Sequence, residues 1–247
     1  GTFIMDIIGF IHTDFIEKFG IPRQSGLIPE LTGVIEFLPE YRQPEAFKGL
    51  QDFSHIWILW EFNRAKKDHW SATVKPPKLG GNTRMGVFAT RSPFRPNNIG
   101  LSSVRLERIE YTEEHGPLLY VSGIDMLDGT PILDIKPYIP YSDCHPDATG
   151  GFTESIDQTP LEVVFAYEPS LQKILSHLGA DKKSALTALL AGDPRPGYQN
   201  DPDRVYGVAF AGYNFRFTVK EKVLTVISIE PLSPEHTAGC RSKDNKK

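Results

Sequence analysis

Two arginines and two prolines are concentrated in one short segment, which reads Arg91-Ser-Pro-Phe-Arg95-Pro-Asn-Asn-Ile-Gly-Leu-Ser. Proline fixes φ, asparagine tolerates left-handed backbone and glycine lets a ligand approach closely, so this composition predicts a rigid loop. Guanidinium groups on a rigid loop suit a carboxylate or a phosphate, because they donate paired hydrogen bonds. The segment therefore predicts an anion-binding site.

A second polar segment reads Asp128-Gly-Thr-Pro-Ile-Leu-Asp134-Ile-Lys136-Pro-Tyr138. Asp-Gly is a turn signal, and the strand expected after it places Asp134, Lys136 and Tyr138 on one face, because strand side chains alternate. A nearby ammonium favours deprotonated neighbours, so Asp134 and Tyr138 are candidate general bases with Lys136 beside them. The alternative is a structural salt bridge in which Asp134 only orients Lys136.

Charge is distributed unevenly along the chain. The 27 basic and 31 acidic residues give a formal net charge of −4, which argues against a general polyanion binder. Residues 64–105, however, hold nine Lys and Arg residues against one acidic residue, Asp68. This concentration predicts a site for an anionic ligand or a nucleic acid, and a solvated surface balanced by distant acids is the other interpretation. The candidates for phosphate contacts are Lys66, Lys67, Lys75 and Lys78.

Several common chemistries have no support in the sequence. We find no Gly-rich dinucleotide motif after a strand, no complete P-loop, no HExxH pair and no GxSxG elbow. Cys144 and Cys240 are far apart in the sequence, which predicts neither a disulfide scaffold nor a metal centre. Apolar runs such as residues 56–60 are too short to cross a membrane. We therefore expect no metal and no membrane contact, and a place in a reducing compartment, the cytoplasm.

The elements that must position these residues are mostly strands. Runs rich in β-branched and aromatic residues occur at 3–11, 33–38, 55–62, 85–90, 101–109, 118–124 and 131–139. No long amphipathic helix separates them, and a doubly wound parallel sheet would need such helices. We therefore predict an antiparallel or mixed β-barrel.

The rest of the chain has a different pattern. After a polar stretch, a strand is expected at 161–167, and Leu171, Ile174, Leu175 and Leu178 have the spacing of an amphipathic helix. A second helix is expected up to Gly192, followed by three strands at 206–211, 214–219 and 223–229. The predicted fold is mainly β: a barrel domain over residues 1–145, a linker at 146–160, a small α+β domain at 161–232 and a flexible tail at 233–247.

Several sequence blocks, taken in order, carry a family resemblance. They are Pro22-Arg-Gln, Phe53-Ser-His-Ile-Trp, Pro76-Pro-Lys-Leu-Gly-Gly, Gly86-Val-Phe-Ala-Thr-Arg-Ser, Arg95-Pro-Asn, Asp128-Gly-Thr-Pro, Asp134-Ile-Lys-Pro-Tyr and Asp193-Pro-Arg-Pro. Over about residues 7–232 the chain resembles the bacterial tRNA methyltransferase O family (TrmO, also described as YaeB-like or TsaA-like). One departure is Asn98, where the family usually has proline.

The resemblance implies a function and a cofactor. It implies a single-sheeted β-barrel methyltransferase that uses S-adenosylmethionine to methylate N6 of threonylcarbamoyladenosine (t6A) at position 37 of tRNA. The product is m6t6A, the expected acceptor is a threonine tRNA, and the expected partners are the tRNA anticodon arm and a second copy of the chain. It also implies cofactor contacts at Pro22, Arg23, Gln24, Asn63, Arg64, Arg91, Leu101, Asp128, Gly129, Thr130 and Pro131. The t6A group carries a carboxylate, for which Arg95 is the candidate partner.

Two other functions stay open at this point. One is a non-enzymatic β-barrel that binds RNA through basic and aromatic residues, and measurable affinity for S-adenosylmethionine would separate it from the enzyme. The other is a hydrolase that uses Asp134 with a histidine, for which no spacing of base and nucleophile is evident.

Overall fold

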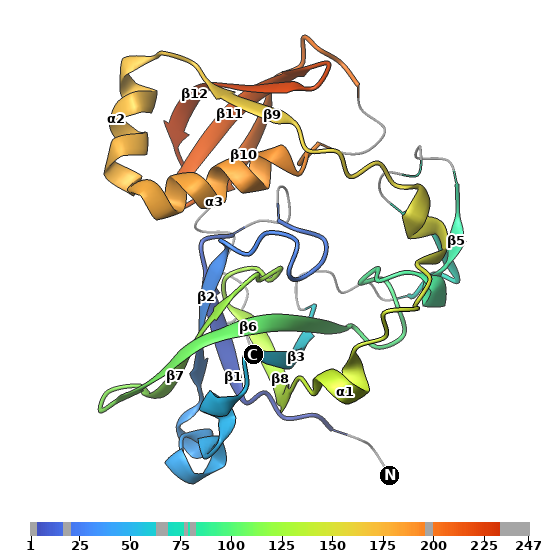
Figure 1. Ribbon diagram of the computed structural model, residues 1–247, viewed down its shortest axis with the longest axis vertical. Helices are drawn as coiled ribbons and strands as arrows, with labels where there is room; N and C mark the ends of the chain where they lie inside the picture. Colours follow the sequence, from blue (N-terminus) through green and yellow to red (C-terminus); the bar gives the residue numbers. More distant parts are fainter. Residues whose placement is uncertain are drawn as a thin grey trace.

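Six strands form the larger of two β units in the computed structural model, which describes residues 4–16, 21–62, 69–76, 79, 83–195 and 200–232. They close into an antiparallel barrel in the order β1-β2-β7-β6-β3-β8, in which β8 pairs back with β1 (Figure 1). The strands are β1 Gly9–Thr13, β2 Thr32–Phe37, β3 His55–Glu61, β6 Ile99–Thr112, β7 Gly116–Ser122 and β8 Thr130–Pro137. Closure leaves the barrel no unpaired edge. The predicted mainly β fold with a barrel is confirmed.

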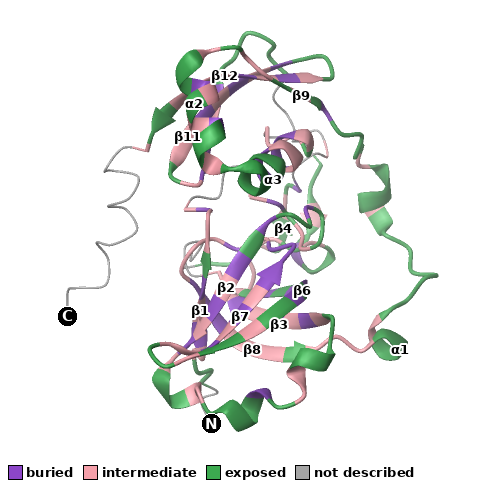
Figure 2. Cartoon of the chain, turned by 60° about the vertical axis from the view of Figure 1, so that its left-hand side comes forward, coloured by how far each residue is buried: buried purple, intermediate pink, exposed green. Residues whose placement is uncertain are grey.

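The alternation of side chains along each strand fills the barrel. In β3, Ile56, Ile58 and Trp60 are buried, whereas Trp57 and Leu59 between them keep part of their surface accessible. This is the period of two expected of a strand with one face on a core. Figure 2 shows the buried residues spread along the barrel strands and along the strands and helices of the C-terminal unit.

Two predicted strands differ from the observed ones. The strand expected at 3–11 begins only at Gly9, whose register partner is Phe37 of β2. The strand expected at 85–90 is only β5, Met85–Gly86, and residues Val87–Ala89 form a 3-10 turn. Thr90 closes that turn, because its amide and its hydroxyl both donate to the Val87 carbonyl, at 3.1 and 2.8 Å. A β-rich composition does not reveal such a turn.

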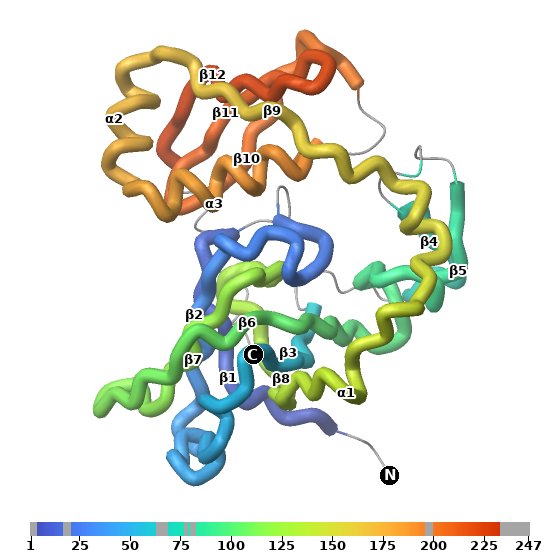
Figure 3. Tube along the Cα trace, viewed as in Figure 1, coloured from blue at the N-terminus to red at the C-terminus, as the bar shows by residue number. Residues whose placement is uncertain are grey.

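Short elements connect the strands. β4, Thr73–Val74, pairs with β5 beside the barrel. Further 3-10 turns lie at Pro39–Tyr41, Pro44–Phe47 and Leu50–Asp52. After β8 come the short helix α1, Pro140–Asp143, and a largely exposed stretch that leads to β9 (Figure 3). The predicted linker at 146–160 is not featureless, since Gly151–Ser155 form a 3-10 helix whose Thr153 hydroxyl donates to Gly150.

The C-terminal unit is a four-stranded sheet covered by two helices. Its strand order is β10-β11-β12-β9, with β9 Glu162–Phe165, β10 Tyr206–Phe210, β11 Tyr213–Lys220 and β12 Val223–Pro231. The helices are α2 Pro169–Leu178 and α3 Ala180–Ala191, as the leucine spacing predicted. The Glu168 carboxylate caps α2 by accepting from the amides of Ser170 and Leu171, at 3.1 and 2.8 Å.

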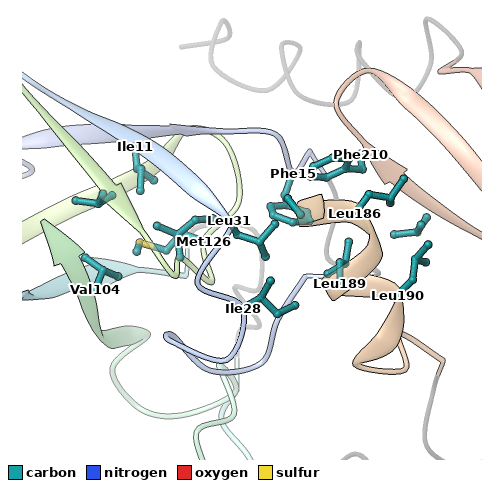
Figure 4. Packing of buried hydrophobic residues seen from close by; sticks show 14 of the residues in the cluster. Ile11, Phe15, Ile28, Leu31, Val104, Met126, Leu186, Leu189, Leu190 and Phe210 are labelled. Atoms are coloured by element: carbon teal, nitrogen blue, oxygen red, sulfur yellow. The ribbon is translucent and has the colours of Figure 1, made fainter. Parts of the chain in front are cut away.

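The two units pack through an apolar contact. Figure 4 shows Phe15 of the barrel unit reaching Phe210, with the leucines of α3 beside Ile28 and Leu31. The rings of Phe15 and Phe210 have their centroids 5.7 Å apart, and both residues are almost fully buried. Lys182 also bonds both oxygens of Asp14 at 3.0 Å. The C-terminal unit is thus fixed on the end of the barrel where β1 finishes.

Candidate active site

Two segments of the predicted site meet through their side chains. The guanidinium of Arg91, from the loop between β5 and β6, donates to the Gln24 side-chain oxygen. Both residues were assigned to cofactor binding through the family resemblance, and they are 67 positions apart in the sequence. The fold therefore brings together a polar pair that no local pattern connects.

The loop that carries Arg91 is tied to itself at several points. Nη1 of Arg95 donates to the carbonyls of Thr90 and Ser92, at 2.9 and 3.3 Å. Nδ2 of Asn98 donates to the Pro93 carbonyl at 2.9 Å. Asn98 thus supplies a side-chain tie where the family usually has proline, and the predicted rigidity of the loop has a structural basis. Arg95 also has a role in the loop that its prediction as a substrate contact did not include.

The Asp128-Gly129 segment forms the predicted turn at the start of β8. Gly129 has φ +77°, a left-handed conformation that glycine adopts without strain. One carboxylate oxygen of Asp128 accepts from the Thr13 amide at 3.0 Å and lies 3.9 Å from the ring of His12. Next to the turn, Thr130 and Pro131 are buried, and the Thr130 hydroxyl donates to the Leu127 carbonyl. The turn is fixed to the end of β1.

A half-buried carboxylate lies in the same region and was missed from sequence. Oδ1 of Asp125 accepts from the Ser102 hydroxyl at 2.7 Å, and Ser102 is fully buried. Burial raises the pKa of Asp125 to about 6, while the Ser102 hydroxyl, its own amide and the Arg91 charge keep it from rising further. A carboxylate with a raised pKa is typical of functional sites. Its sequence signal is an acidic residue between the apolar residues Ile124 and Met126.

Trp60 and Gly100 extend this contact chain into the barrel. The indole Nε1 of Trp60 donates to the Ser102 hydroxyl oxygen at 2.9 Å. Trp60 pairs with Gly100 across β3 and β6, and a Cβ at Gly100 would lie 2.2 Å from the indole ring. Glycine is required here because the ring lies directly against the backbone. The Trp60 indole, the Ser102 hydroxyl and the Asp125 carboxylate are thus joined in one chain of hydrogen bonds.

The predicted catalytic residues lie on the outer face of the barrel. Asp134 accepts from the Ile135 amide at 2.8 Å, and its other oxygen is 3.9 Å from Nζ of Lys136. Both side chains are at least half exposed, as in a surface ion pair. In strand register, Asp134 pairs with Leu59, which pairs with Leu101 on the other side.

Tyr138 departs from its prediction in two respects. β8 ends at Pro137, so Tyr138 lies one residue beyond the strand, with its ring 5.6 Å from that of Trp57. Desolvation first, and then Cys144 and Asp143, raise the pKa of its hydroxyl. The expected effect of Lys136 was the opposite. This direction does not favour Tyr138 as a general base.

Arg23 links the barrel to the C-terminal unit. Pro22 beside it is buried, whereas Arg23 is exposed. Desolvation lowers the pKa of Arg23, and the Asp193 carboxylate opposes this. Asp193 itself bonds Arg195 through both carboxylate oxygens at 2.9 Å. The Asp193-Pro-Arg segment, one of the blocks that carry the family resemblance, thus acts electrostatically on Arg23 of the barrel unit.

Of the remaining predicted site residues, the structure describes only some. Leu101 is 55% exposed on the outside of β6, and Lys75 is exposed next to β4. Five predicted residues lie outside the part of the chain that the structure describes: Asn63, Arg64, Lys66, Lys67 and Lys78.

Sequence reasoning also missed an aromatic pair beside this site. Trp70 and Phe88 stack with centroids 6.3 Å apart and planes at 25°, and they are 51% and 75% exposed. Large exposed aromatic rings in contact are uncommon on a surface without a partner. Phe88 was assigned to a strand, which hid its exposure.

Other kinds of site have no counterpart in the described residues. No group of three or more His, Cys, Asp and Glu side chains there could hold a metal ion. No helix of the described part is long and apolar enough to span a bilayer. A shallow groove of about 530 Å³ lies between Glu30 and one face of α3, and it is lined by none of the predicted site residues.

Comparison with known proteins identifies the family. Residues 10–144 match the tRNA-methyltransferase O N-terminal domain, and residues 158–232 match the TrmO C-terminal domain. The chain belongs to the TrmO family. It is 38% identical over 233 residues to the tRNA (adenine(37)-N6)-methyltransferase of Escherichia coli K12, covering 93% of this chain and 99% of the relative.

Two further similarities agree with the TrmO assignment. A putative S-adenosylmethionine-dependent methyltransferase, RcsF, of Pseudomonas aeruginosa is 45% identical over 206 residues, covering 81% of this chain and 86% of that protein. The crystal structure of TrmO from Pseudomonas aeruginosa aligns with TM-score 0.74 and 35% identity, covering 93% of this chain and 99% of that one. As a TrmO member, the chain is a methyltransferase with S-adenosylmethionine as its cofactor.

The residues at the site fit that cofactor chemically. S-adenosylmethionine presents a carboxylate, an ammonium, ribose hydroxyls and a sulfonium cation. Arg91 and the amide of Gln24 suit the carboxylate, and the carboxylates of Asp125 and Asp128 suit cationic and hydroxyl groups. The chain offers this donor set from three segments that converge at one end of the barrel.

Proposed function

We propose that this methyltransferase converts t6A to m6t6A at position 37 of tRNA, with a threonine tRNA as the expected acceptor. The observation that carries the proposal is the Arg91–Gln24 pair, which occurs in a chain that aligns along nearly its whole length with an adenine-37 N6-methyltransferase. The family assignment favours this enzyme over a non-enzymatic RNA-binding barrel. The hydrolase alternative loses support, because within the described structure Asp134 bonds Ile135 and Lys136 and no histidine.

The reaction sets clear demands on the site. The bound cofactor supplies an electrophilic methyl group on sulfur. A bond from the methyl carbon to N6 forms, the bond from that carbon to sulfur breaks, and the N6 proton passes to a base. The N6 lone pair of t6A is delocalised into the ureido group, so proton removal assists the transfer, which otherwise depends on in-line positioning.

Asp134 is the base that we propose. It shares an outward row with Leu59 and Leu101, so it is two strand spacings, roughly 10 Å, from the predicted cofactor contact at Leu101. Its half-exposed carboxylate is open to a large substrate. Nζ of Lys136 lies 3.9 Å from its second carboxylate oxygen.

The surface next to Arg91 is suited to RNA. The stacked pair Trp70–Phe88 offers faces for unpaired bases, and the exposed lysine and arginine side chains of the same region include Lys75 and Arg84. Arg84 is fixed by hydrogen bonds to Thr73 at 2.8 and 2.7 Å. Residues 69–106 contain no acidic residue, so a second copy docking symmetrically here would bring like charges together, whereas phosphates would neutralise them. The anticodon arm is the partner that we assign to this surface.

The deciding experiment compares two tRNA substrates. Labelled S-adenosylmethionine is incubated with the protein and with tRNA from cells able or unable to make t6A. We expect label only in tRNA that carries t6A. Equal incorporation into both would overturn the t6A assignment.

Arg95 provides a sharper version of this test. If Arg95 binds the threonylcarbamoyl carboxylate, Arg95→Gln abolishes the preference for modified tRNA. Asn98→Ala loosens the same loop without removing the cation, and we expect it to keep that preference. Loss of the preference in both variants would assign Arg95 to the loop alone.

The proposal also includes a homodimer, as the family resemblance implies, and a place in the cytoplasm, as the cysteine pattern predicts. Light scattering at micromolar concentration should give about twice the chain mass of 27.7 kDa. A monomeric mass would contradict this part of the proposal and leave the reaction unaffected.

A further inference from the structure

We propose that His12 is a positioning residue for cofactor binding: its imidazole, held by Glu36, orients the Asp128 carboxylate in the turn that receives S-adenosylmethionine. His12 belongs to none of the segments through which the family resemblance assigns cofactor contacts. The proposal rests on the TrmO assignment and on the cofactor contact implied for Asp128, and it is independent of the t6A substrate.

The first support is the place of the imidazole between two carboxylates. Nε2 of His12 lies 2.9 Å from Oε2 of Glu36, and its Nδ1 lies 3.9 Å from Oδ1 of Asp128. His12 of β1 pairs with Val34 of β2, so Glu36, two residues further along β2, lies diagonally opposite on the same outer face. The ring therefore connects a strand residue to the predicted cofactor turn.

The second support is the way in which Glu36 is held. Its Oε1 lies 2.8 Å from Nδ1 of His115 and 3.5 Å from Nη2 of Arg42, while Oε2 faces His12. Arg42 is itself fixed, because its Nε donates to the Phe37 carbonyl at 2.8 Å. The hydrogen bonds from His12 and His115 outweigh burial and hold the pKa of Glu36 below its usual value. Glu36 is thus an ionised, fixed anchor for the His12 ring.

The third support is what reaches the Asp128 turn from β1. The Gly129 amide donates to the Ile11 carbonyl at 2.8 Å, and the Thr13 amide donates to Oδ1 of Asp128 at 3.0 Å. An ionised carboxylate only accepts hydrogen bonds, so Nε2 of His12 carries a proton toward Glu36. In its protonated form the ring also presents Nδ1–H to the Asp128 oxygen that the Thr13 amide orients. One strand therefore holds both the backbone and the carboxylate of the turn.

His115 provides a matched control. It shares the Glu36 carboxylate with His12, and the two side chains are 43% and 54% exposed. The second ring nitrogen differs, because Nε2 of His115 lies 3.6 Å from Glu114 in the turn between β6 and β7. His115 thus has the same anchor as His12 and faces a carboxylate away from the predicted cofactor turn. An effect on the cofactor that is specific to His12 must pass through Asp128.

The test measures cofactor binding without RNA. S-adenosylmethionine is titrated calorimetrically at pH 6, where an ordinary imidazole is largely protonated. His12→Gln keeps a donor for Glu36 and removes the nitrogen that faces Asp128, and its half-exposed site lies outside the barrel core. We expect roughly 2- to 5-fold weaker binding, the scale of one partly exposed ion pair. His115→Gln should bind as the wild type does, and an equal loss in both variants would overturn the proposal.

A double-mutant cycle separates positioning from a general effect on the fold. Asp128→Asn should weaken binding roughly tenfold, the scale of a hydrogen bond to a charged group. Adding His12→Gln to Asp128→Asn should cause no further loss, because His12 acts only through the carboxylate that it orients. The same loss from His12→Gln with and without Asp128→Asn would overturn the proposal, as would wild-type affinity in either single variant. Neither result bears on the t6A assignment, because no RNA is present.

Discussion

Arg91 is the residue on which cofactor binding should depend most directly. Its guanidinium lies on a loop tied by Arg95 and Asn98, so it is presented in a narrow range of positions. We expect Arg91→Ala to weaken S-adenosylmethionine binding by roughly 1.5–3 kcal/mol, the scale of a hydrogen bond to a charged group. Calorimetry measures this change. Arg105→Ala, which removes an exposed arginine from the same basic region, should leave the affinity unaltered.

Asp125 should reduce the stability of the fold at neutral pH. Its pKa is raised from 3.8 to about 6, so the folded protein holds this proton more tightly than the unfolded chain. The stability from this protonation is present below pH 4 and is lost as the pH rises through 6. Each tenfold difference in proton affinity between the folded and unfolded states is worth about 1.4 kcal/mol.

Asp125→Asn removes that pH dependence. We expect the variant to gain about 2–3 kcal/mol in unfolding free energy relative to wild type between pH 4 and pH 8. Urea unfolding at the two pH values measures it. If the difference in unfolding free energy between the variant and the wild type is the same at both pH values, the pKa of Asp125 is not raised in the folded protein.

At the scale of single residues, the sequence predicts some members of the candidate site and misses others. Gln24 and Arg91 were predicted as site residues because each belongs to a block that resembles the family. Their contact depends on closure of the barrel, which no local sequence pattern predicts. Asp125 sits in a run that is otherwise apolar, so local composition predicts only a buried strand end. An acidic residue in an apolar run indicates a functional position. Its hydrogen-bond partner Ser102, however, is 23 residues away and can be identified only from the structure.

At the scale of elements, the β4–β5 pair and the turn after it form the RNA-facing unit of the proposal. We expect Trp70→Ala and Phe88→Ala each to weaken tRNA binding by about 1–3 kcal/mol, the cost of one lost base–aromatic stack, with cofactor affinity unchanged. Filter binding of tRNA measures the effect. Tyr167→Ala, at an aromatic ring that is 96% exposed on the C-terminal unit, is the control. Equal losses in all three variants would remove the aromatic pair from the interface.

The same element shows why strand prediction failed locally. Met85 to Thr90 has a β-like composition, yet the Val87 carbonyl is used by Thr90 and not by a neighbouring strand. The helices at 169–178 and 180–191 were predictable, because their leucines repeat with helical spacing and Gly179 and Gly192 bound them. Periodicity identifies long amphipathic elements, whereas short turns depend on single hydrogen bonds.

At the scale of the whole molecule, the contact between the two units was beyond sequence reasoning. Asp14 and Phe15 follow β1 directly, and they meet Lys182 and Phe210, which lie 168 and 195 residues further along the chain. The Asp128 amide also donates to the Phe15 carbonyl, so the residue that docks the C-terminal unit is bonded to the predicted cofactor turn. The position of one unit is therefore coupled to the backbone of the site.

Phe15→Ala tests this coupling. Phe15 is 1% exposed between the units, so its truncation should cost about 3–5 kcal/mol and loosen the docking of the C-terminal unit. Urea unfolding measures the first effect. Faster proteolysis in the exposed stretch at 144–160 measures the second, with Phe53→Ala, at a ring that is 37% exposed, as the control. Because the Phe15 carbonyl remains, the Asp128 turn keeps its hydrogen bond, and we expect cofactor affinity to fall less than stability. A Phe15→Ala protein that is as stable and as protease-resistant as wild type would show that this ring does not hold the two units together.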